Sequence, residues 1–249
     1  MKIGVFDSGV GGLSVLKSLY EANLFNEVIY YGDTARVPYG VKDKDTIIKF
    51  CLEALDFFEK FDIDMLIIAC NTASAYALKA LQEKAKFPIY GVIDAGIEAT
   101  KKTLKKNQNI LVIATKATIN SKAYQDRLQK EGFNHINALS TSLFVPMVEE
   151  GIFEGEFLQS AFEYYFKDIQ KPDGLILACT HFPLISKALS EYFGENTKLI
   201  HSGDAIVDFL KTHKDLPTLK HKAKLNFYAS SDVNSLKNTA KIWLNINEN

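Results

Sequence analysis

Short apolar runs alternate along the chain with longer stretches in which apolar residues recur at helical spacing. The runs in the first half are KIGVF, EVIYY, MLIIA and PIYGV, and those in the second half are NILVIA, INALS, GLILA and KLIHS. Between them, residues 44–61 place Ile47, Cys51, Leu55 and Phe58 three or four residues apart, which predicts an amphipathic helix. Alternating strands and helices predict an α/β fold in which helices cover both faces of parallel sheets.

The two halves of the chain also resemble each other. The segment DMLIIACN, which begins at Asp64, matches DGLILACT, which begins at Asp173, so that Asp, Leu, Ile, Ala and Cys recur at a constant offset of 109 residues. A repeat of this kind predicts an internal duplication. We therefore expect two pseudo-symmetric parallel-sheet α/β domains with an active site in the cleft between them.

The repeat also predicts the domain boundaries. We expect residues 1–94 together with 207–249 to form the first domain, and residues 95–206 to form the second. The C-terminal part holds one strand-like run, LNFYAS, and one helical pattern around Trp243, which is too little for a core of its own. We expect it to complete the sheet of the first domain.

Composition excludes several classes of protein. The 249 residues are 47% hydrophobic and 24% charged with a formal net charge of -1, so no positive field attracts nucleic acid or an anionic membrane. The N-terminal apolar stretch is too short for a secretory signal, and no apolar run reaches the roughly 18 residues that span a bilayer. We expect a cytoplasmic protein without a nucleic-acid or membrane partner.

Three cysteines lie far apart without a CxxC pair, which argues against a disulfide framework and against a zinc ribbon. Cys51 lies on the apolar face of its predicted helix, where we expect its thiol to pack in the core without a chemical role. Cys70 and Cys179 each follow a predicted strand and precede a predicted helix start, and Asn71 or Thr72 is expected to cap the first of these helices. A helix N-terminus lowers the pKa of a thiol. Because the two positions are equivalent, we expect both thiols to be functional.

Other polar residues also follow predicted strands, where parallel sheets collect ligands. They are Asp7, Ser8, Asn71, Thr72, Thr115, Thr180 and His181. His181 is expected to be the proton partner of Cys179 or a substrate contact, with a helix cap as the alternative. Asp7 is the corresponding group for Cys70, and its alternative is to cap the helix predicted over residues 12–22.

Three further segments leave alternatives open. DSGVGG lacks the glycine that a GxGxxG fingerprint requires at position 14, which is Ser14, and it lacks the P-loop lysine. It fits a carboxylate-binding loop or a tight turn instead. GDTARVPYG, residues 32–40, is either a loop that closes over a ligand or a plain surface turn. Glu149 and Glu150 face either the cleft or solvent.

Two equivalent thiols on opposite walls of a cleft suit the inversion of a carbon stereocentre. One thiolate removes a proton from one face of the carbon, and one thiol returns a proton to the other face. Two thiolates beside an anionic substrate would repel each other, which favours one proton shared between the walls. A nucleophilic hydrolase needs one cysteine with a histidine, and a disulfide enzyme needs two sulfurs that touch.

Four motifs, FDSGVGG, GDTARVPYG, ACNTAS and CTHFPL, resemble in order and spacing the motif set of glutamate racemases. These cofactor-independent enzymes make D-glutamate for bacterial peptidoglycan. The resemblance spans essentially the whole chain and implies glutamate as the small-molecule partner, with neither cofactor nor metal. The alternatives are a racemase of aspartate or another amino acid, and a non-catalytic amino-acid-binding protein. The oligomeric state stays open, with a homodimer as one candidate.

The resemblance also implies a role for individual residues. It implies that Cys70 and Cys179 are the two acid–base residues, assisted by Asp7 and His181. The residues that it implies as substrate contacts are Asp7, Ser8, Tyr39, Gly40, Asn71, Thr72, Thr115, Glu149, Thr180 and His181.

Overall fold

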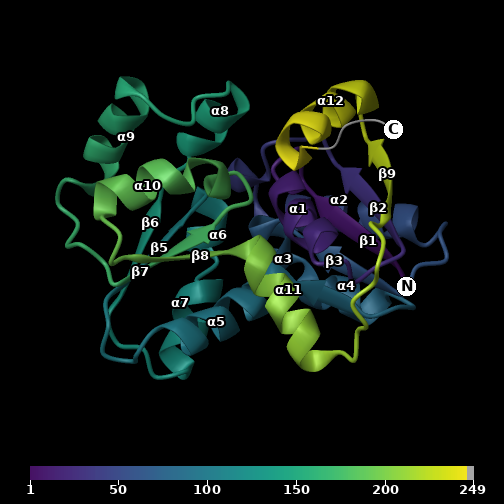
Figure 1. Cartoon of the computed structure of the whole chain (residues 1–249), viewed down its shortest axis with the longest axis horizontal. Helices are drawn as coiled ribbons and strands as arrows, with labels where there is room; N and C mark the ends of the chain where they lie inside the picture. The colour runs from purple at the N-terminus through teal and green to yellow at the C-terminus, as the bar shows by residue number, and fades with distance from the viewer. Residues whose placement is uncertain (246–249) are drawn as a thin grey trace.

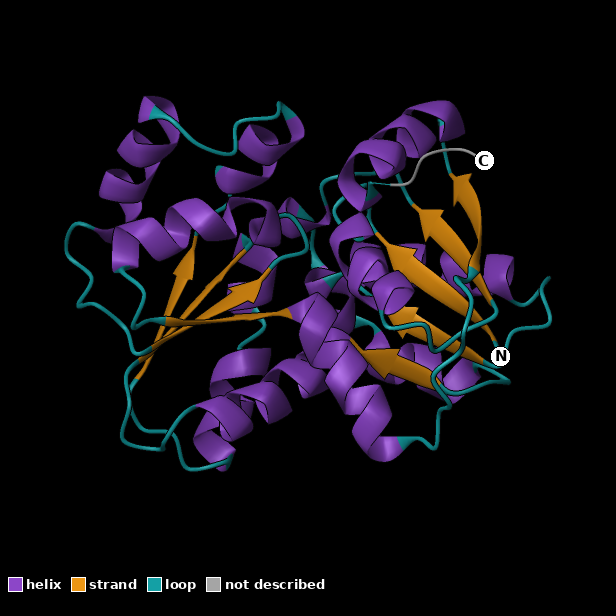
Figure 2. Cartoon of the chain, viewed as in Figure 1, coloured by secondary structure: helices purple, strands orange, loops and turns teal. Residues whose placement is uncertain are grey.

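Nine strands form two separate sheets in the part of the chain that the computed structural model describes, residues 1–245. Figure 2 shows the sheets as two groups of arrows. The first sheet has the order β4-β3-β1-β2-β9, with β1 Lys2–Asp7, β2 Glu27–Gly32, β3 Met65–Ile68, β4 Ile89–Gly91 and β9 Lys224–Ala229. The second has the order β6-β5-β7-β8, with β5 Ile110–Ala114, β6 Ile136–Ser140, β7 Gly174–Ala178 and β8 Lys198–His201.

The two sheets share one topology. Every strand pair is parallel, and the order β4-β3-β1-β2 in the first sheet corresponds to β8-β7-β5-β6 in the second. The predicted α/β fold with two equivalent parallel sheets is therefore confirmed. The run LNFYAS forms β9, which extends the first sheet beside β2, as expected.

Helices connect the strands. The α-helices of residues 1–245 are α1 Leu13–Glu21, α2 Lys44–Phe58, α3 Asn71–Tyr76, α4 Leu78–Lys84, α5 Val92–Thr103, α6 Lys116–Asn120, α7 Ala123–Lys130, α8 Phe144–Glu149, α9 Glu156–Phe166, α10 Ser186–Phe193, α11 Ser202–His213 and α12 Val233–Leu244. Two short 3-10 helices are η1 Tyr39–Val41 and η2 Phe182–Ile185. α2 ends three residues before the predicted position 61, because the chain tightens there into a turn in which Phe61 N–H donates to the carbonyl of Phe58.

Alternating side chains of each strand face different cores. In β1, Ile3 and Val5 pack in the same cluster as residues of α1, α11 and α12, whereas Phe6 packs on the opposite face with residues of α2 and α3. Cys51 of α2 is 1% exposed within that second cluster, in agreement with its predicted packing role. Both faces of the first sheet are therefore covered, as a parallel sheet requires.

Two helices join the sheets. α5 follows β4 and α11 follows β8, and the two helices pack against each other in the middle of the molecule (Figure 1). α5 serves both halves, because Val92 lies in a core cluster of the first sheet and Ile93 in one of the second. Among residues 1–245 we find no helix with the length and apolar character needed to span a bilayer.

Candidate active site

The carboxyl ends of strands from both sheets border one pocket. Its lining residues are Ser8, Val37, Pro38, Tyr39, Gly40, Cys70, Asn71, Thr72, Thr115, Val145, Glu149, Ala178, Cys179, Thr180 and His181. All the candidate site residues are among them except Asp7, which is completely buried and hydrogen-bonded to Thr180. Val145 was not foreseen, because nothing in an apolar helix sequence distinguishes a pocket-facing residue from a core residue.

Cys70 forms one wall of the pocket and is itself the N-cap of α3. Its Sγ accepts a hydrogen bond from Ala73 N–H at 3.5 Å and donates one to Ser8 Oγ at 3.6 Å. The prediction that Asn71 or Thr72 caps this helix is therefore wrong. Burial, and next the negative charge of Asp7, raise the pKa of the Cys70 thiol to about 12. The expected lowering by the helix N-terminus is also wrong for Cys70, because burial outweighs it.

Cys179 forms the other wall and has a different environment. Its Sγ lies 3.7 Å from Nδ1 of His181, and Nε2 of the same ring lies 3.0 Å from Oε1 of Glu149. Burial by itself lowers the pKa of His181, but the contacts with Cys179 and Glu149 outweigh it and raise that pKa to about 10. Glu149 thus contacts His181 and lines the pocket, so of the two orientations that the sequence left open for Glu149, the structure has the one that faces the cleft.

Asp7 lies between the two halves. Its carboxylate accepts hydrogen bonds from Gly9 N–H at 2.9 Å and from the hydroxyl of Thr180 at 3.3 Å. Burial raises the pKa of Asp7, and the positive charge of His181 is the main opposing influence. The Asp7 carboxylate also interacts with the backbone of Gly12, the N-cap residue of α1, so the capping alternative is borne out in part. Asp7 also orders the glycine-rich turn and contacts the segment that carries Cys179.

Three threonine hydroxyls form a cluster across the pocket floor. Oγ1 of Thr72, which follows the first sheet, lies 3.0 Å from both Thr115 Oγ1 and Thr118 Oγ1, and the last two lie 3.1 Å apart. Thr118 was missed from the sequence, although its spacing of three residues from Thr115 at a helix start is a capping signal. Thr72 and Thr115 line the pocket, so their hydroxyls are accessible to a ligand, whereas Thr118 is buried behind them and does not line it.

The side chain of Asn71 makes contacts outside the pocket. Its amide donates to Ser202 Oγ at 3.1 Å, and its carbonyl accepts from the hydroxyl of Tyr124 at 2.7 Å. Ser202 opens α11, which follows the last strand of the second sheet, and Tyr124 belongs to α7 of the second half. Asn71 therefore joins the two halves beside Cys70.

The segment GDTARVPYG is not a plain surface turn. Asp33 and Tyr39 are both buried, at 0% and 1% exposure, and the turn formed by Tyr39 and Gly40 lines the pocket. The surface-turn alternative is therefore wrong, and closure of this segment over a ligand stays a prediction.

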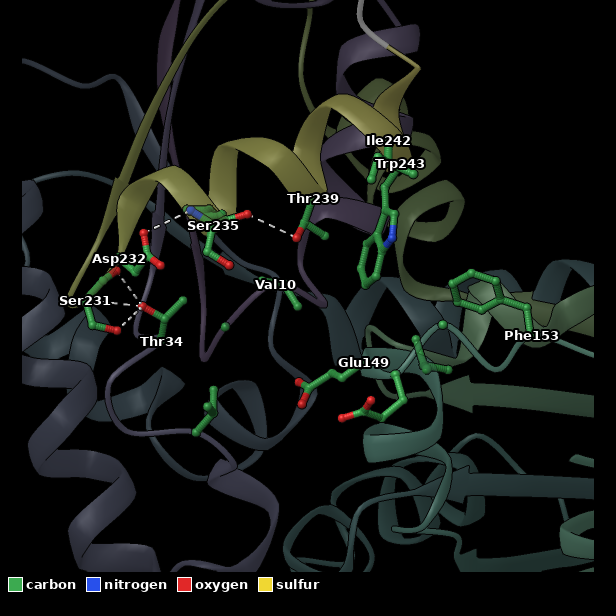
Figure 3. A pocket seen from close by; sticks show the side chains of 16 residues that line it. Val10, Thr34, Glu149, Phe153, Ser231, Asp232, Ser235, Thr239, Ile242 and Trp243 are labelled. Carbon is green, nitrogen blue, oxygen red and sulfur yellow. Dashed lines mark hydrogen bonds between the residues drawn. The ribbon is translucent and has the colours of Figure 1, made fainter. Parts of the chain in front are cut away.

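A second, wider cleft of about 600 Å³ lies beside the pocket. Figure 3 shows it between α12, which carries Trp243, and the segment around Glu149 and Phe153. Val37 and Glu149 line both this cleft and the pocket, so the two spaces adjoin. Within residues 1–245 we find no group of three His, Cys, Asp or Glu side chains placed to hold a metal ion.

Known proteins resemble this chain over its full length. The sequence model of the Asp/Glu/Hydantoin racemase family matches residues 4–210. A glutamate racemase of Campylobacter jejuni subsp. jejuni is 78% identical over 247 residues, which cover 99% of each chain. The crystal structure of a glutamate racemase from the same subspecies matches with a TM-score of 0.99 and 77% identity, covering 100% of both chains. A glutamate racemase from Francisella tularensis subsp. tularensis, solved in complex with D-glutamate, matches with a TM-score of 0.87 and 33% identity, covering 100% of this chain and 95% of that one.

Proposed function

Since the chain belongs to the Asp/Glu/Hydantoin racemase family and is an amino-acid isomerase, we propose that it interconverts L- and D-glutamate by proton transfer between Cα and two cysteines. The observation that carries the proposal is the placement of Cys70 and Cys179. They follow equivalent strands, β3 and β7, of two sheets with the same topology, and both line one pocket. Each thiol also has an acid–base companion, Asp7 or His181.

The two walls of the pocket suit different roles in one direction of the reaction. Cys70, whose pKa is raised to about 12, is a thiol at neutral pH. The imidazole of His181 lies beside Cys179, where its positive charge stabilises negative charge that the sulfur carries during the reaction. We therefore propose that Cys179, acting as a thiolate, is the base and that Cys70 is the acid. The thiolate takes the proton from one face of Cα, and the Cys70 thiol donates a proton to the opposite face.

The intermediate is an anion in which the electron pair of the broken C–H bond is delocalised into the α-carboxylate. Preorganised donors stabilise such charge where it develops. Hydroxyls of Ser8, Thr72 and Thr115, together with Thr180, line the pocket and are our candidates for that role. After one turnover the proton sits on Cys179 and the charge on Cys70, which is the state required for the reverse direction.

The choice of glutamate rests on the relatives. The Francisella tularensis relative was solved with D-glutamate, and the chain resembles glutamate racemases over its full length. We further propose that the D-glutamate is used for peptidoglycan. We propose the domain division 1–94 plus 207–249 and 95–206, of which residues 246–249 lie outside the described residues.

The proposal is tested by incubating the purified protein with L-glutamate in deuterated water without added cofactor. We expect loss of optical rotation together with deuterium incorporation at Cα, because a proton returned by a thiol comes from solvent. L-Aspartate serves as the matched substrate control and is expected to react more slowly. An unchanged rotation with glutamate would contradict the proposal, and faster reaction of aspartate would favour aspartate as the substrate.

A further inference from the structure

Asp33 is a buried carboxylate that takes no part in the proton-transfer scheme. It follows β2 directly and has no exposed surface. Its carboxylate accepts hydrogen bonds from the hydroxyl of Tyr39 and from Nε of Arg36, the latter at 2.9 Å. A buried charge is costly unless it is paired and hydrogen-bonded, so these contacts have to be maintained in the folded protein.

The hydroxyl of Tyr39 is held by Asp33, while its backbone turn borders the pocket. The ring lies 6.5 Å from that of Phe6 and 5.8 Å from that of Phe50, measured between ring centroids. Tyr39 and Gly40 both line the pocket, and because the ring and hydroxyl of Tyr39 are engaged elsewhere, we infer that the turn presents its backbone to a substrate. Asp33 thus holds the hydroxyl end of the Tyr39 side chain, and Tyr39 itself borders the pocket.

The turn has little freedom to move. A Cβ atom on Gly40 would lie 2.5 Å from Cβ of Thr115, so η1 is seated directly against the start of α6 in the other half. A contact this close is possible only for glycine. A small displacement of η1 therefore changes the distance between its backbone and the hydroxyl of Thr115, and both belong to the pocket lining.

Arg36 neutralises Asp33 and is itself held in place. Its guanidinium lies 4.2 Å from the centre of the Phe50 ring and also pairs with Glu53, whose side chain is 46% exposed. Glu53 is thus a second carboxylate on the same arginine, and it does not line the pocket. A substitution of Glu53 therefore serves as a control for the loss of a carboxylate that pairs with Arg36.

The beginning of the segment is fastened on two further sides. Asp33 N–H donates to the carbonyl of Asp7 at 3.0 Å, which ties it to the glycine-rich turn. Thr34 Oγ1 donates to the carbonyl of Ser231 at 3.0 Å and accepts from Ser231 N–H at 3.2 Å, as the dashed lines at the left of Figure 3 indicate. With its start fixed, the Tyr39–Gly40 turn is held by the packing of the Tyr39 ring, by Thr115 and by the contact between Asp33 and Tyr39, and the last of these is its polar anchor.

We propose that Asp33 is a positioning residue that places the backbone of Tyr39 and Gly40 against the pocket and so determines the affinity for substrate. The role rests on the proposed glutamate racemisation, and it concerns binding and not proton transfer. Loss of an interaction made equally in the ground state and the transition state raises KM and leaves kcat unchanged.

The first test compares Asp33→Asn with Glu53→Gln in steady-state racemisation of glutamate. Asn removes the negative charge and replaces one acceptor oxygen with an NH2 group, which weakens the hydrogen bonds from Tyr39 and Arg36, and we expect KM to rise about tenfold with kcat within about twofold of wild type. Glu53→Gln removes a carboxylate from the same arginine and is expected to leave KM within about twofold. An unchanged KM in Asp33→Asn, a fall in kcat alone, or an equal rise in Glu53→Gln would overturn the proposal.

The second test uses Tyr39→Phe, which keeps the buried ring and removes only the hydroxyl, so that it remains informative if Asp33→Asn does not fold. KM is expected to rise here too, and the Asp33→Asn/Tyr39→Phe double variant is expected to match Asp33→Asn, because both changes delete one contact. Additive increases would overturn the proposal. An inactive wild type would contradict the proposed function instead, so the two failures are distinguishable.

Discussion

Cys70 and Cys179 are equivalent in the fold but differ in their charged neighbours. The carboxylate of Asp7 faces Cys70 and opposes a negative charge on it, whereas the imidazole of His181 faces Cys179 and favours one. In the proposed reaction this difference suits Cys70 to donate a proton and Cys179 to accept one. The proposed proton transfer across Cα needs one acid and one base, and one turnover exchanges the two roles.

Replacing either of these cysteines should abolish racemisation. Because acid–base groups contribute about 10²- to 10⁴-fold each, we expect Cys70→Ala and Cys179→Ala to reduce the rate in both directions by at least about a hundredfold. Cys51→Ala is the matched control, since Cys51 is a third buried thiol that does not line the pocket. Circular dichroism at fixed glutamate concentration measures all three. Full activity in Cys179→Ala would rule out the two-base scheme.

Residues that repeat along the chain can be located from the sequence, whereas residues whose role depends on tertiary contacts cannot. Cys70 and Cys179 can be recognised from their constant offset, and both line one pocket. Thr118 was missed because its partner Thr72 is 46 residues away in the chain. The pKa direction of Cys70 was wrong because burial, which raises it, is a property of the folded protein and not of the local helix start.

At the scale of elements, α3, α7 and α11 meet at one buried hydrogen-bond junction. Tyr124 of α7 and Ser202 of α11 both bond to the side chain of Asn71, which opens α3. These partners lie 53 and 131 residues from Asn71, so hydrophobic periodicity predicts the helices but not the junction. The contact fixes the start of α3, whose N-cap is Cys70.

The junction predicts that a Tyr→Phe substitution lowers stability more at position 124 than at an exposed position. Tyr124→Phe removes a buried hydroxyl and leaves the Asn71 carbonyl without that partner, which should lower the free energy of unfolding by about 1–3 kcal/mol. Tyr164→Phe is the control, because Tyr164 is 72% exposed and such changes stay within about 0.5 kcal/mol. Urea unfolding followed by circular dichroism gives both values. Equal stability of the two variants would show that the junction contributes nothing measurable.

At the scale of the whole molecule, the pocket is also where the two halves are fastened together. The hydroxyl of Ser14 in α1 donates to the carbonyl of Thr180 at 2.6 Å, and Asp7 accepts from the Thr180 hydroxyl. The two parallel sheets and the helices that cover them could be predicted from the sequence because they depend on patterns within each half. The fit between the halves could not, because it depends on such pairwise contacts across the pocket.

Two buried groups of the pocket, His181 and Cys70, make the free energy of unfolding fall as the pH rises. Folding raises the pKa of His181 from 6.5 to about 10, so its stabilising contribution is complete below pH 6.5 and is lost as the pH rises toward 10. Folding raises the pKa of Cys70 from 9.0 to about 12, and its contribution is lost over that higher range. We therefore expect the free energy of unfolding, measured with urea, to fall between pH 6.5 and about 10 and to fall further above it. In His181→Asn, the free energy of unfolding should change little between pH 6.5 and about 10 and should still fall above that range. A free energy of unfolding in the wild type that stays constant or increases over the first range would contradict a protonated His181 in the folded pocket.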